Sequence, residues 1–476
     1  MESFDVAVVG GGPAGATLSM RLAGYGLPVC LLDKGMKARQ HVGETLPASM
    51  HSMLQELGLS HRLDEAAARR PPRHWVIWGR KERRLVPLDE GCFVWRGPFD
   101  RLLLDAARER GVVVRSGVSV IRFDRRGSRV DGASGEPRST CVHYLDGDGN
   151  ERALLTRLVA DASGRSGVLA RRFRQREGRF QTVALTGHWS GGEDTEATVI
   201  EALPQGWVWS APLGNGLRDV TLMLDREAVW GGPHTIYRSA LTSAPETIAM
   251  LRGASLARTP RAVDATSYTS RRFAGLDFVL LGDAASFLDP LSAHGVHKAM
   301  DSAMTAAVVA HTILGRPPVA GEDAVHFYNR RQAALYEVAK ERLGELYRQE
   351  TRWPREVFWT KRQAQGRRVG KAGRLSLAGP RSPLRPEMRL RPAPGCRLGW
   401  APVLEDNFIE RREVVMGPTE PAGVRFWRGA CLPDLFRRAV EGERTVAEAA
   451  RGAAVGFPKA VKALAWLYRS GFLIER

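Results

Sequence analysis

Residues 4–33 read FDVAVVGGGPAGATLSMRLAGYGLPVCLLD, and this stretch decides the fold of the first part of the chain. The apolar run Val6–Val9 is short enough to be a buried parallel strand. A glycine turn, a helical pattern and a second apolar run follow in that order. The second run ends in Asp33, an acid that can accept hydrogen bonds from ribose hydroxyls. Asp33 and the following Lys34 are both predicted to bind the cofactor. The stretch therefore predicts a βαβ unit that binds a dinucleotide.

The glycine turn has G-x-G-x-x-G spacing. Gly10 allows a tight turn, Gly12 allows the backbone to approach a pyrophosphate, and Gly15 allows helix and strand to pack closely. The helix that starts here offers free N–H groups and a partial positive charge to the same anion. The residues predicted to bind the cofactor in this turn are Gly10, Gly12, Pro13, Ala14 and Gly15. Taken alone, the turn fits NAD, NADP or FAD equally.

The totals limit the class of protein. The chain has 476 residues and is 43% hydrophobic, which is enough for a large core and two or three domains. With 70 Lys and Arg against 52 Asp and Glu, its formal charge is +18. That charge predicts attraction to nucleic acid, anionic lipid or an acidic protein face, although an arginine-rich proteome would give the same value. The five cysteines are scattered without C-x-x-C spacing, so we predict neither a metal site nor a disulfide framework.

The ends of the chain and its apolar runs bear on its location. The first strand begins so close to residue 1 that no room is left for a signal peptide. No apolar run approaches the roughly 20 residues that a membrane-spanning helix needs. We therefore expect a cytoplasmic protein without a transmembrane segment.

Two features between the first βαβ unit and the middle of the chain are candidates for a binding site. Gly43-Glu44-Thr45 reads as a loop before a helix; Glu44 and Thr45 either contact the second half of the cofactor or cap that helix. Trp75 and Trp78 alternate in HWVIWG, which indicates a strand that lines a pocket or belongs to the core.

Two later strands end in an acid and a glycine turn. One carries Asp161 and Gly164, and the other carries Gly282 and Asp283. This arrangement is typical of a nucleotide site at the carboxyl ends of parallel strands. Residues 180–270 between them contain strand-like runs and predict an inserted, mostly antiparallel sheet on the substrate side.

The loop before the next long helix is a further candidate. That helix is expected to begin near His297, and its N-terminus can stabilise negative charge. Pro290, Gly295 and Val296 are predicted to lie at the cofactor. His294 is the candidate catalytic residue, or else a histidine that caps the helix.

The C-terminal part has a different composition. Residues 346–390 are basic and rich in proline, which predicts a linker, and residues 391–476 predict a small separate domain. Thr445 and Glu448 fit a capping box, and the order helix, helix, strand indicates a winged-helix-like module. Docking of a polypeptide is favoured over nucleic acid because no polar base-reading face stands out; a structural cap is the alternative.

Together these motifs resemble the class A flavoprotein monooxygenases, which have the p-hydroxybenzoate hydroxylase fold, over residues 1–345. The resemblance implies an FAD-binding Rossmann-like α/β domain with the inserted sheet, and FAD as the cofactor. It implies that Asp33 holds the adenosine ribose and that Arg96, which precedes Phe99-Asp100, approaches the ribityl–phosphate region. Asp283 would bind the ribityl chain or the pyrophosphate.

The resemblance also implies the chemistry. The 290–296 loop would lie against the isoalloxazine ring, and reduced FAD would react with O2 to give a C4a-hydroperoxide whose distal oxygen an electron-rich ring attacks. NAD(P)H or an external reductase would supply the electrons. Trp75, Trp207 and Trp209 are the candidate residues of the substrate pocket, or else core residues.

A second resemblance is to the flavin-dependent halogenases. Trp207-x-Trp209-x-x-Pro is similar to their W-x-W-x-I-P motif, with Ala211 in place of the Ile. The lysine that relays hypohalous acid in that family would fall near residues 69–73, which read RRPPR. A guanidinium stays protonated and is a poor substitute for an amine, and Lys81 lies beyond the following strand. Oxygen insertion is therefore favoured over chlorination.

The 289–299 loop looks closest to the flavoprotein monooxygenases that mature tryptophylquinone cofactors, such as that of quinohemoprotein amine dehydrogenase. This resemblance implies hydroxylation of a peptidyl tryptophan in a partner subunit, and the basic surface would favour an acidic partner. The alternatives are a halogenase of an indole, phenol or pyrrole, a flavin reductase like the geranylgeranyl reductases, or a redox-inert binding protein.

Overall fold

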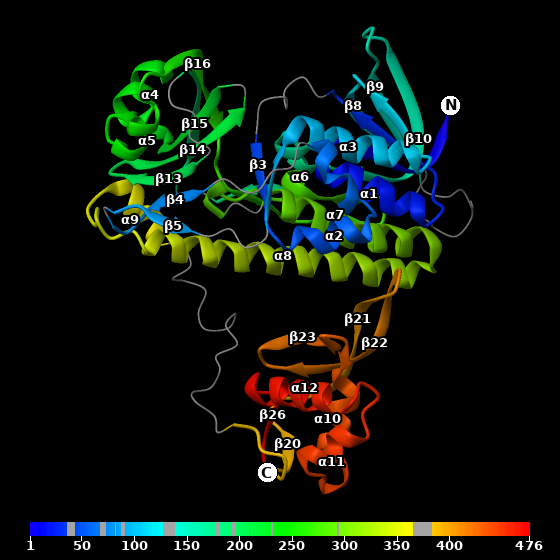
Figure 1. Cartoon of the computed structure of the whole chain (residues 1–476). Helices are drawn as coiled ribbons and strands as arrows, with labels where there is room; N and C mark the ends of the chain where they lie inside the picture. Colours follow the sequence, from blue (N-terminus) through cyan, green and yellow to red (C-terminus); the bar gives the residue numbers. More distant parts are fainter. Residues whose placement is uncertain are drawn as a thin grey trace. The chain divides into compact units, whose positions relative to one another are not determined.

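The computed structural model in Figure 1 forms two compact units, each with its own hydrophobic core. The first unit contains Met1–Arg316 and Tyr328–Gly366, and the second contains Pro317–Phe327 and Arg367–Arg476. The structure describes residues 1–35, 43–66, 73–80, 82–86, 91–126, 139–177, 180–191, 197–214, 216–229, 232–292, 295–364 and 383–476.

A parallel sheet forms the base of the first unit. Its five parallel strands lie in the order β19-β10-β1-β2-β7. Their bounds are β1 Ser3–Val9, β2 Val29–Asp33, β7 Val113–Ser116, β10 Glu151–Asp161 and β19 Phe278–Leu280. The apolar run Val6–Val9 is buried, as expected for a strand covered on both faces. The predicted βαβ unit is confirmed.

Antiparallel strands join this sheet on the β19 side of β1. They are β8 (Ser119–Arg126), β9 (Ser139–Leu145) and β18 (Ala274–Gly275). β18 pairs with β19, and β9 pairs with both β10 and β8. The β9–β10 hairpin turns over residues 146–150, where Asp146 Oδ1 accepts the N–H groups of Asp148 and Asn150.

Helices cover the parallel sheet (Figure 1). They are α1 (Pro13–Gly24), α2 (Met50–Glu56), α3 (Arg96–Glu109), α6 (Gly282–Ala285) and α7 (Gly295–Gly315). α1 packs against both α3 and α7. The small residues of α7, among them Ala303, Ala306 and Ala307, are fully buried, so this helix can lie close to α1.

A second, seven-stranded sheet has the order β16-β12-β15-β14-β13-β4-β5. Its bounds are β4 His74–Ile77, β5 Arg84–Val86, β12 Thr182–Ser190, β13 Thr198–Leu203, β14 Gly206–Gly214, β15 Leu217–Asp225 and β16 Ser255–Asp264. All neighbours are antiparallel except β4 and β13. The mostly antiparallel sheet predicted for 180–270 is confirmed, and β4 and β5 join it from an earlier part of the chain.

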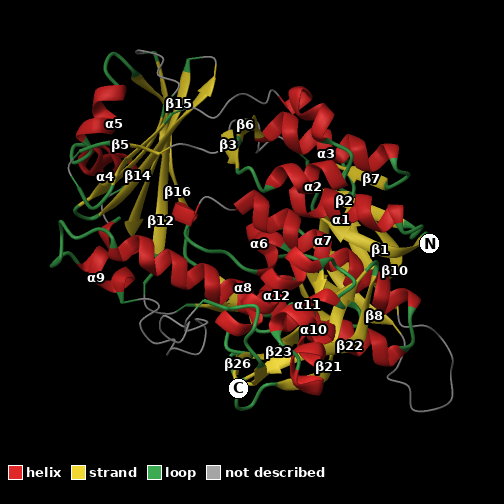
Figure 2. Ribbon diagram, turned by 60° about the horizontal axis from the view of Figure 1, so that its bottom comes forward, coloured by secondary structure: helices red, strands yellow, loops and turns green. Residues whose placement is uncertain are grey.

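The two faces of this sheet are both buried but are covered by different helices (Figure 2). The α4 face packs against α4 (Pro233–Leu241) and α5 (Pro245–Met250). The α8 face packs against α8 (Pro318–Arg348) and α9 (Val357–Gln363). The α4 face includes Leu185, Val208, Val220, Leu222 and Leu224, and the α8 face includes Ala184, Ala202, Trp207, Trp209 and Met223.

The linker predicted for 346–390 is wrong for residues 346–364. Helix α9 lies in that segment, and Trp359 and Arg362 are fully buried. The basic residues gave the segment a linker-like composition, but the aromatic residues among them bury it against the α8 face. Residues 365–382 lie outside the described part of the chain.

The second unit combines helices and short strands. The strands are β20 Leu390–Pro392, β21 Arg397–Glu405, β22 Phe408–Gly417, β23 Glu420–Val424, β24 Phe426–Trp427, β25 Ala430–Cys431 and β26 Leu473–Glu475. The helices are α10 Leu432–Val440, α11 Val446–Arg451 and α12 Phe457–Arg469. The predicted capping box is confirmed, because Thr445 Oγ1 accepts Glu448 N and Glu448 Oε2 accepts Thr445 N.

The predicted order of helix, helix and strand in this unit corresponds to α11, α12 and β26. β26 pairs with β20 and so joins the end of the unit to its beginning, while β21, β22 and β23 form a separate three-stranded sheet. Among the helices that the structure describes in the whole chain, none is long and apolar enough to cross a membrane.

Candidate functional site

The glycine turn after β1 has no space for side chains. Gly10 has φ 105°, and a Cβ there would lie 2.5 Å from the carbonyl oxygen of Ala162. A Cβ on Gly15 would lie 1.9 Å from the carbonyl oxygen of Gly10. α1 starts at Pro13 after Gly12, its first turn is buried, and no side chain caps it in the described structure. A buried, uncapped helix start needs an external acceptor for its N–H groups, so this turn fits a pyrophosphate.

Asp33 lies directly beside this turn. Its Oδ1 accepts a hydrogen bond from Gly11 N at 2.8 Å, and its Oδ2 accepts one from Gly35 N at 2.9 Å. Each carboxylate oxygen keeps a second lone pair, which suits a ribose hydroxyl. Lys34 is exposed next to it.

The Gly-Glu-Thr stretch and Arg96 come together through a short ladder. β3 (Gly43–Leu46) pairs with β6 (Cys92–Trp95), so Gly43 lies opposite Trp95, and Glu44 and Thr45 follow in the same strand. Arg96 begins α3 directly after β6.

The guanidinium of Arg96 is held by the next turn of α3. Its Nε lies 3.1 Å and its Nη2 3.3 Å from the two oxygens of Asp100, which is fully buried. A paired contact of this kind fixes the plane of the guanidinium, as binding of a phosphate or ribityl group requires.

Asp161 ends β10 next to the glycine turn, but its carboxylate is engaged within the chain. Oδ1 accepts from the N–H and the hydroxyl of Ser163, and Oδ2 accepts from Leu169 N and Ala170 N at 2.7 and 2.8 Å. These four bonds hold the following loop in place. Gly164 in that loop has φ 64° and open space around it.

The Gly282-Asp283 turn lies between α1 and α7. A Cβ on Gly282 would lie 3.2 Å from Ala14 Cβ and 3.4 Å from Ala299 Cβ. Asp283 Oδ1 forms an ion pair with Lys298 Nζ at 3.0 Å. The turn is therefore beside the helix start that fits the pyrophosphate, and Lys298 is a partner that the sequence did not indicate.

The loop before α7 is only partly described. Pro290 is exposed and begins a short 3₁₀ turn, Gly295 is exposed at the start of α7, and Val296 is buried. The candidate catalytic residue His294 lies outside the described residues.

The three tryptophans predicted to line the substrate pocket do not share a face. Trp207 and Trp209 lie on the α8 face, whereas Trp75 pairs with Val199 and lies on the α4 face, where Arg83 stacks 4.7 Å above its ring. Trp78 instead joins Trp207, with ring centroids 6.4 Å apart. Residues three apart in a strand point to opposite faces, so the HWVIWG pattern contained this information.

The α8 face also carries polar residues that the sequence did not single out. Asp219 Oδ1 accepts a hydrogen bond from Thr221 Oγ1 at 2.7 Å, and its Oδ2 lies 3.8 Å from His188 Nε2. Thr221 shares a further bond with Thr186. Burial raises the pKa of Asp219 to about 7. Such a carboxyl can exchange a proton near neutral pH.

Two more polar groups lie on the same face, two and three strands away from Asp219. His74 pairs with Thr198 across the β4–β13 ladder. Burial lowers the pKa of His74 to about 4, so its ring is neutral. His74 Nε2 and Thr198 Oγ1 are buried and have no hydrogen-bond partner in the part of the chain that the structure describes.

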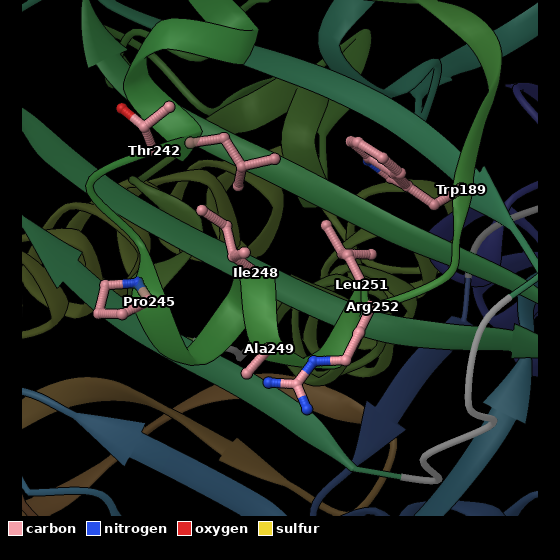
Figure 3. Close-up of a pocket in the computed structure, with 8 residues that line it drawn as sticks. Trp189, Thr242, Pro245, Ile248, Ala249, Leu251 and Arg252 are labelled. Carbon is pink, nitrogen blue, oxygen red and sulfur yellow. The ribbon is translucent and has the colours of Figure 1, made fainter.

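A cavity of about 490 Å³ lies on the opposite side of the sheet (Figure 3). It is open and is lined by Trp189, Ile248, Leu251 and Arg252 together with other residues of α4, α5 and their connection. Trp189 follows His188 in β12 and so points to the α4 face. This cavity is thus separate from the residues around the glycine turn.

A comparison with known families gives the class of protein to which this site belongs. The chain matches the FAD binding domain family over residues 3–333 and belongs to it. The family match supports FAD as the cofactor that the glycine turn, Asp33 and Arg96 are predicted to bind. The prediction of an FAD-dependent oxidoreductase is confirmed at the level of the family.

Individual relatives are halogenases and a hydroxylase. The chain is 32% identical over 351 residues to a tryptophan 2-halogenase of Chondromyces crocatus, covering 69% of this chain and 65% of the relative. It is 31% identical over 344 residues to a flavin-dependent halogenase of Armillaria mellea, again with 65% of the relative covered. The chain thus spans 65% of the length of these curated relatives.

Two solved structures correspond to nearly the whole chain. One is the peptidyl tryptophan dihydroxylase QhpG, essential for tryptophylquinone cofactor biogenesis, with TM-score 0.76, 24% identity, and 98% of this chain and 99% of that chain covered. The other is the flavin-dependent halogenase CmlS, with TM-score 0.78, 24% identity, and coverage of 100% and 96%. At this identity the likeness concerns the fold, and it extends through the C-terminal unit.

Proposed function

We propose that this chain is an FAD-dependent monooxygenase that hydroxylates an electron-rich aromatic ring, namely a tryptophan side chain in a partner polypeptide. The observation that supports a polypeptide substrate is the full-length likeness to the peptidyl tryptophan dihydroxylase, which covers 98% of this chain and includes the C-terminal unit. That unit is the candidate for docking the polypeptide. The halogenase CmlS is matched over the whole chain as well, so the choice of hydroxylation rests on the side chains described next.

The side chains of the α8 face support oxygen insertion over halogenation. Its described polar groups include the carboxyl, hydroxyl and imidazole groups of Asp219, Thr221 and His74. The cations of α9 that reach this face, Lys361 and Arg362, are both paired with Asp225. Lys298 lies near the glycine turn, but its ammonium is held by Asp283 and by the carbonyl oxygen of Ser286. An ammonium engaged in this way is poorly suited to relay a hypohalous acid.

The protein's own contribution is positioning and proton transfer. Bound FAD, once reduced, supplies activated oxygen from O2. The glycine turn, Asp33 and Arg96 would hold the cofactor, and Trp209, partly buried on the α8 face, is the candidate residue to contact the substrate ring. Asp219, with its pKa of about 7, is the group that takes up the proton released from the ring.

The proposal is tested with purified FAD-loaded protein, chemically reduced and exposed to O2 in the presence of a tryptophan-containing polypeptide subunit of a tryptophylquinone enzyme. We expect the mass of one or two oxygen atoms to appear on one tryptophan, as located by peptide mass spectrometry. Because the net charge is +18, oxygenation of an acidic subunit should weaken as salt is raised. Turnover of free indoles or phenols with the subunit untouched would contradict the proposal.

Halogenation is the second candidate, and a specific observation favours it. The two curated relatives described above are halogenases, one of them acting on tryptophan. The same assay with added bromide or chloride separates the two reactions, since a halogen gives a characteristic isotope pattern. A halogenated product that forms in place of the oxygenated one would favour this candidate.

A further inference from the structure

Asp289, in the loop before α7, is a buried carboxylate with both oxygens occupied. Oδ1 accepts a hydrogen bond from Leu291 N at 3.1 Å, and Oδ2 accepts one from the Tyr347 hydroxyl at 2.7 Å. Its own N–H donates to Ser267 Oγ at 3.2 Å. Burial raises the pKa of Asp289, and the nearby Arg362 guanidinium opposes that shift. A carboxylate without water depends on these few donors.

Tyr347, in α8, connects this carboxylate to the second sheet. Its hydroxyl lies 3.2 Å from Trp207 Nε1, which can only donate. The hydroxyl therefore accepts from Trp207 and gives its single proton to Asp289, so the direction of both bonds is fixed. Tyr347 is fully buried, and burial raises its pKa well above the ordinary value, which keeps the phenol protonated as a donor.

The two ends of this hydrogen-bonded series belong to different parts of the first unit. Trp207 lies in β14, on the α8 face of the seven-stranded sheet, whereas Asp289 lies in the loop that follows β19 of the parallel sheet. Leu288 and Leu291 of the same loop pack against the Trp207 cluster. The loop is thus held to the α8 face on both sides of Asp289.

We propose that Tyr347 is a positioning residue for the flavin: through Asp289 it fixes residues 288–291 of the loop expected to face the isoalloxazine ring, in register with Trp207. This inference rests on the proposed function for the place of the ring. Loss of the hydroxyl leaves Asp289 Oδ2 without a donor and Trp207 Nε1 without an acceptor, so both ends move. A misplacement of reacting groups by about 1 Å can change rates by about 10²-fold.

The chain provides a matched control on the α4 face. Tyr237 is also fully buried, its hydroxyl also accepts from a tryptophan, Trp189 Nε1 at 2.9 Å, and it donates to the carbonyl oxygen of Val220 at 3.0 Å. Tyr237→Phe therefore removes the same hydroxyl group from a similar environment. In the described part of the chain, that hydroxyl is bonded to Trp189 and Val220 and not to Asp289.

The experiment compares the wild-type protein, Tyr347→Phe and Tyr237→Phe, each loaded with FAD. The readouts are FAD bound per chain, visible circular dichroism of the bound flavin, and the rate at which chemically reduced flavin is reoxidised by O2. For Tyr347→Phe we expect full FAD content, an altered dichroism spectrum and reoxidation changed by about tenfold. Tyr237→Phe should match the wild type in all three.

Identical spectra and rates for Tyr347→Phe and the wild type would overturn the proposal, and so would an equal change in Tyr237→Phe. If Tyr347→Phe does not fold, Asp289→Asn serves instead, because it keeps the side-chain volume and removes the charge. Asp289→Asn with wild-type spectra and reoxidation would then overturn the proposal.

The readouts need no aromatic substrate, so they are independent of the proposed hydroxylation. Altered flavin spectra in Tyr347→Phe together with no oxygenation of any tryptophan would reject the proposed function and leave the positioning role in place. Oxygenation of a tryptophan by the wild type, together with unaltered flavin spectra in Tyr347→Phe, would reject the positioning role and leave the proposed function in place.

Discussion

The α4 and α8 faces of the seven-stranded sheet are built from the same strands, yet they differ in chemistry. The α4 face is filled mainly by aliphatic residues such as Val220 and Leu222, and the buried Glu201 carboxylate on this face accepts hydrogen bonds from backbone N–H groups of α5. The α8 face carries Asp219, Asp225 and a cluster of aromatic rings. Each face has a hydrogen bond from a tryptophan to a buried tyrosine. The tyrosine hydroxyl then donates to a backbone carbonyl on the α4 face and to a carboxylate on the α8 face.

We interpret this difference as a division between a face that mainly stabilises the fold and a face that serves a site. Apolar burial stabilises a fold directly, whereas buried charges cost desolvation energy and must be matched by partners. Natural proteins depart from the purely apolar solution mainly where function requires it. The α8 face is the one that contacts the loop before α7, so its charges coincide with the side on which the flavin is expected.

Breaking the charged network of the α8 face should have the largest effect. Arg362 is fully buried, with Nη1 2.7 Å from Asp225 Oδ1 and Nη2 2.7 Å from Thr182 Oγ1. Arg362→Met leaves Asp225 buried and paired with the more distant ammonium of Lys361, 3.6 Å from Asp225 Oδ2. We therefore expect a loss of about 3–5 kcal/mol in the free energy of unfolding. Denaturant titration measures it, with the exposed Arg226→Met as a control within about 0.5 kcal/mol. Equal values for the two variants would contradict the comparison.

On the α4 face, removal of apolar volume should cost stability and leave the flavin unaffected. Leu222 is fully buried, and Leu222→Ala should lower the free energy of unfolding by about 3 kcal/mol. Bound FAD per chain and its visible spectrum should stay as in the wild type. A changed flavin spectrum would mean that the α4 face also shapes the site.

Much of this arrangement follows from local sequence. The glycine turn, Asp33 and the first βαβ unit were predictable because all their parts lie within 30 residues and obey strict steric rules. The capping box at Thr445 was equally local. The opposite orientations of Trp75 and Trp78 were also present in the strand period, but the interpretation grouped Trp75 with Trp207 and Trp209.

Other features depend on contacts between distant residues. Tyr347 and Asp289 are 58 residues apart, and no period or motif connects them. Asp161 matched a cofactor-contacting motif, but its four bonds to the following loop become visible only in the folded chain. Arg362 looked like part of a basic linker because its burial is produced by Phe358 and Trp359 next to it.

A third prediction uses the pH dependence of the α8 face. Asp219 has a pKa raised by burial to about 7 from its ordinary 3.8, so its contribution to stability is present below pH 4 and is lost as the pH rises through 7. From pH 5 to pH 7 the wild type should lose about 2 kcal/mol relative to Asp219→Asn, measured by denaturant titration at both pH values. His188 is a titratable group close to Asp219, so His188→Gln is the control that separates its titration from that of Asp219. A difference independent of pH would contradict the raised pKa.

The smallest change in the free energy of unfolding is expected at the rim of the α4 face. A substitution there tests how far the apolar core of that face extends. Ile248 lines the open cavity in Figure 3 and is 41% exposed, whereas Leu222 is fully buried. Ile248→Ser should change the free energy of unfolding by no more than about 0.5 kcal/mol, since exposed positions lose little apolar burial. The flavin spectrum should again be unaltered. A loss of unfolding free energy close to that of Leu222→Ala would mean that the cavity wall is part of the apolar core. The α4 face could then not be divided into a stabilising core and an open groove.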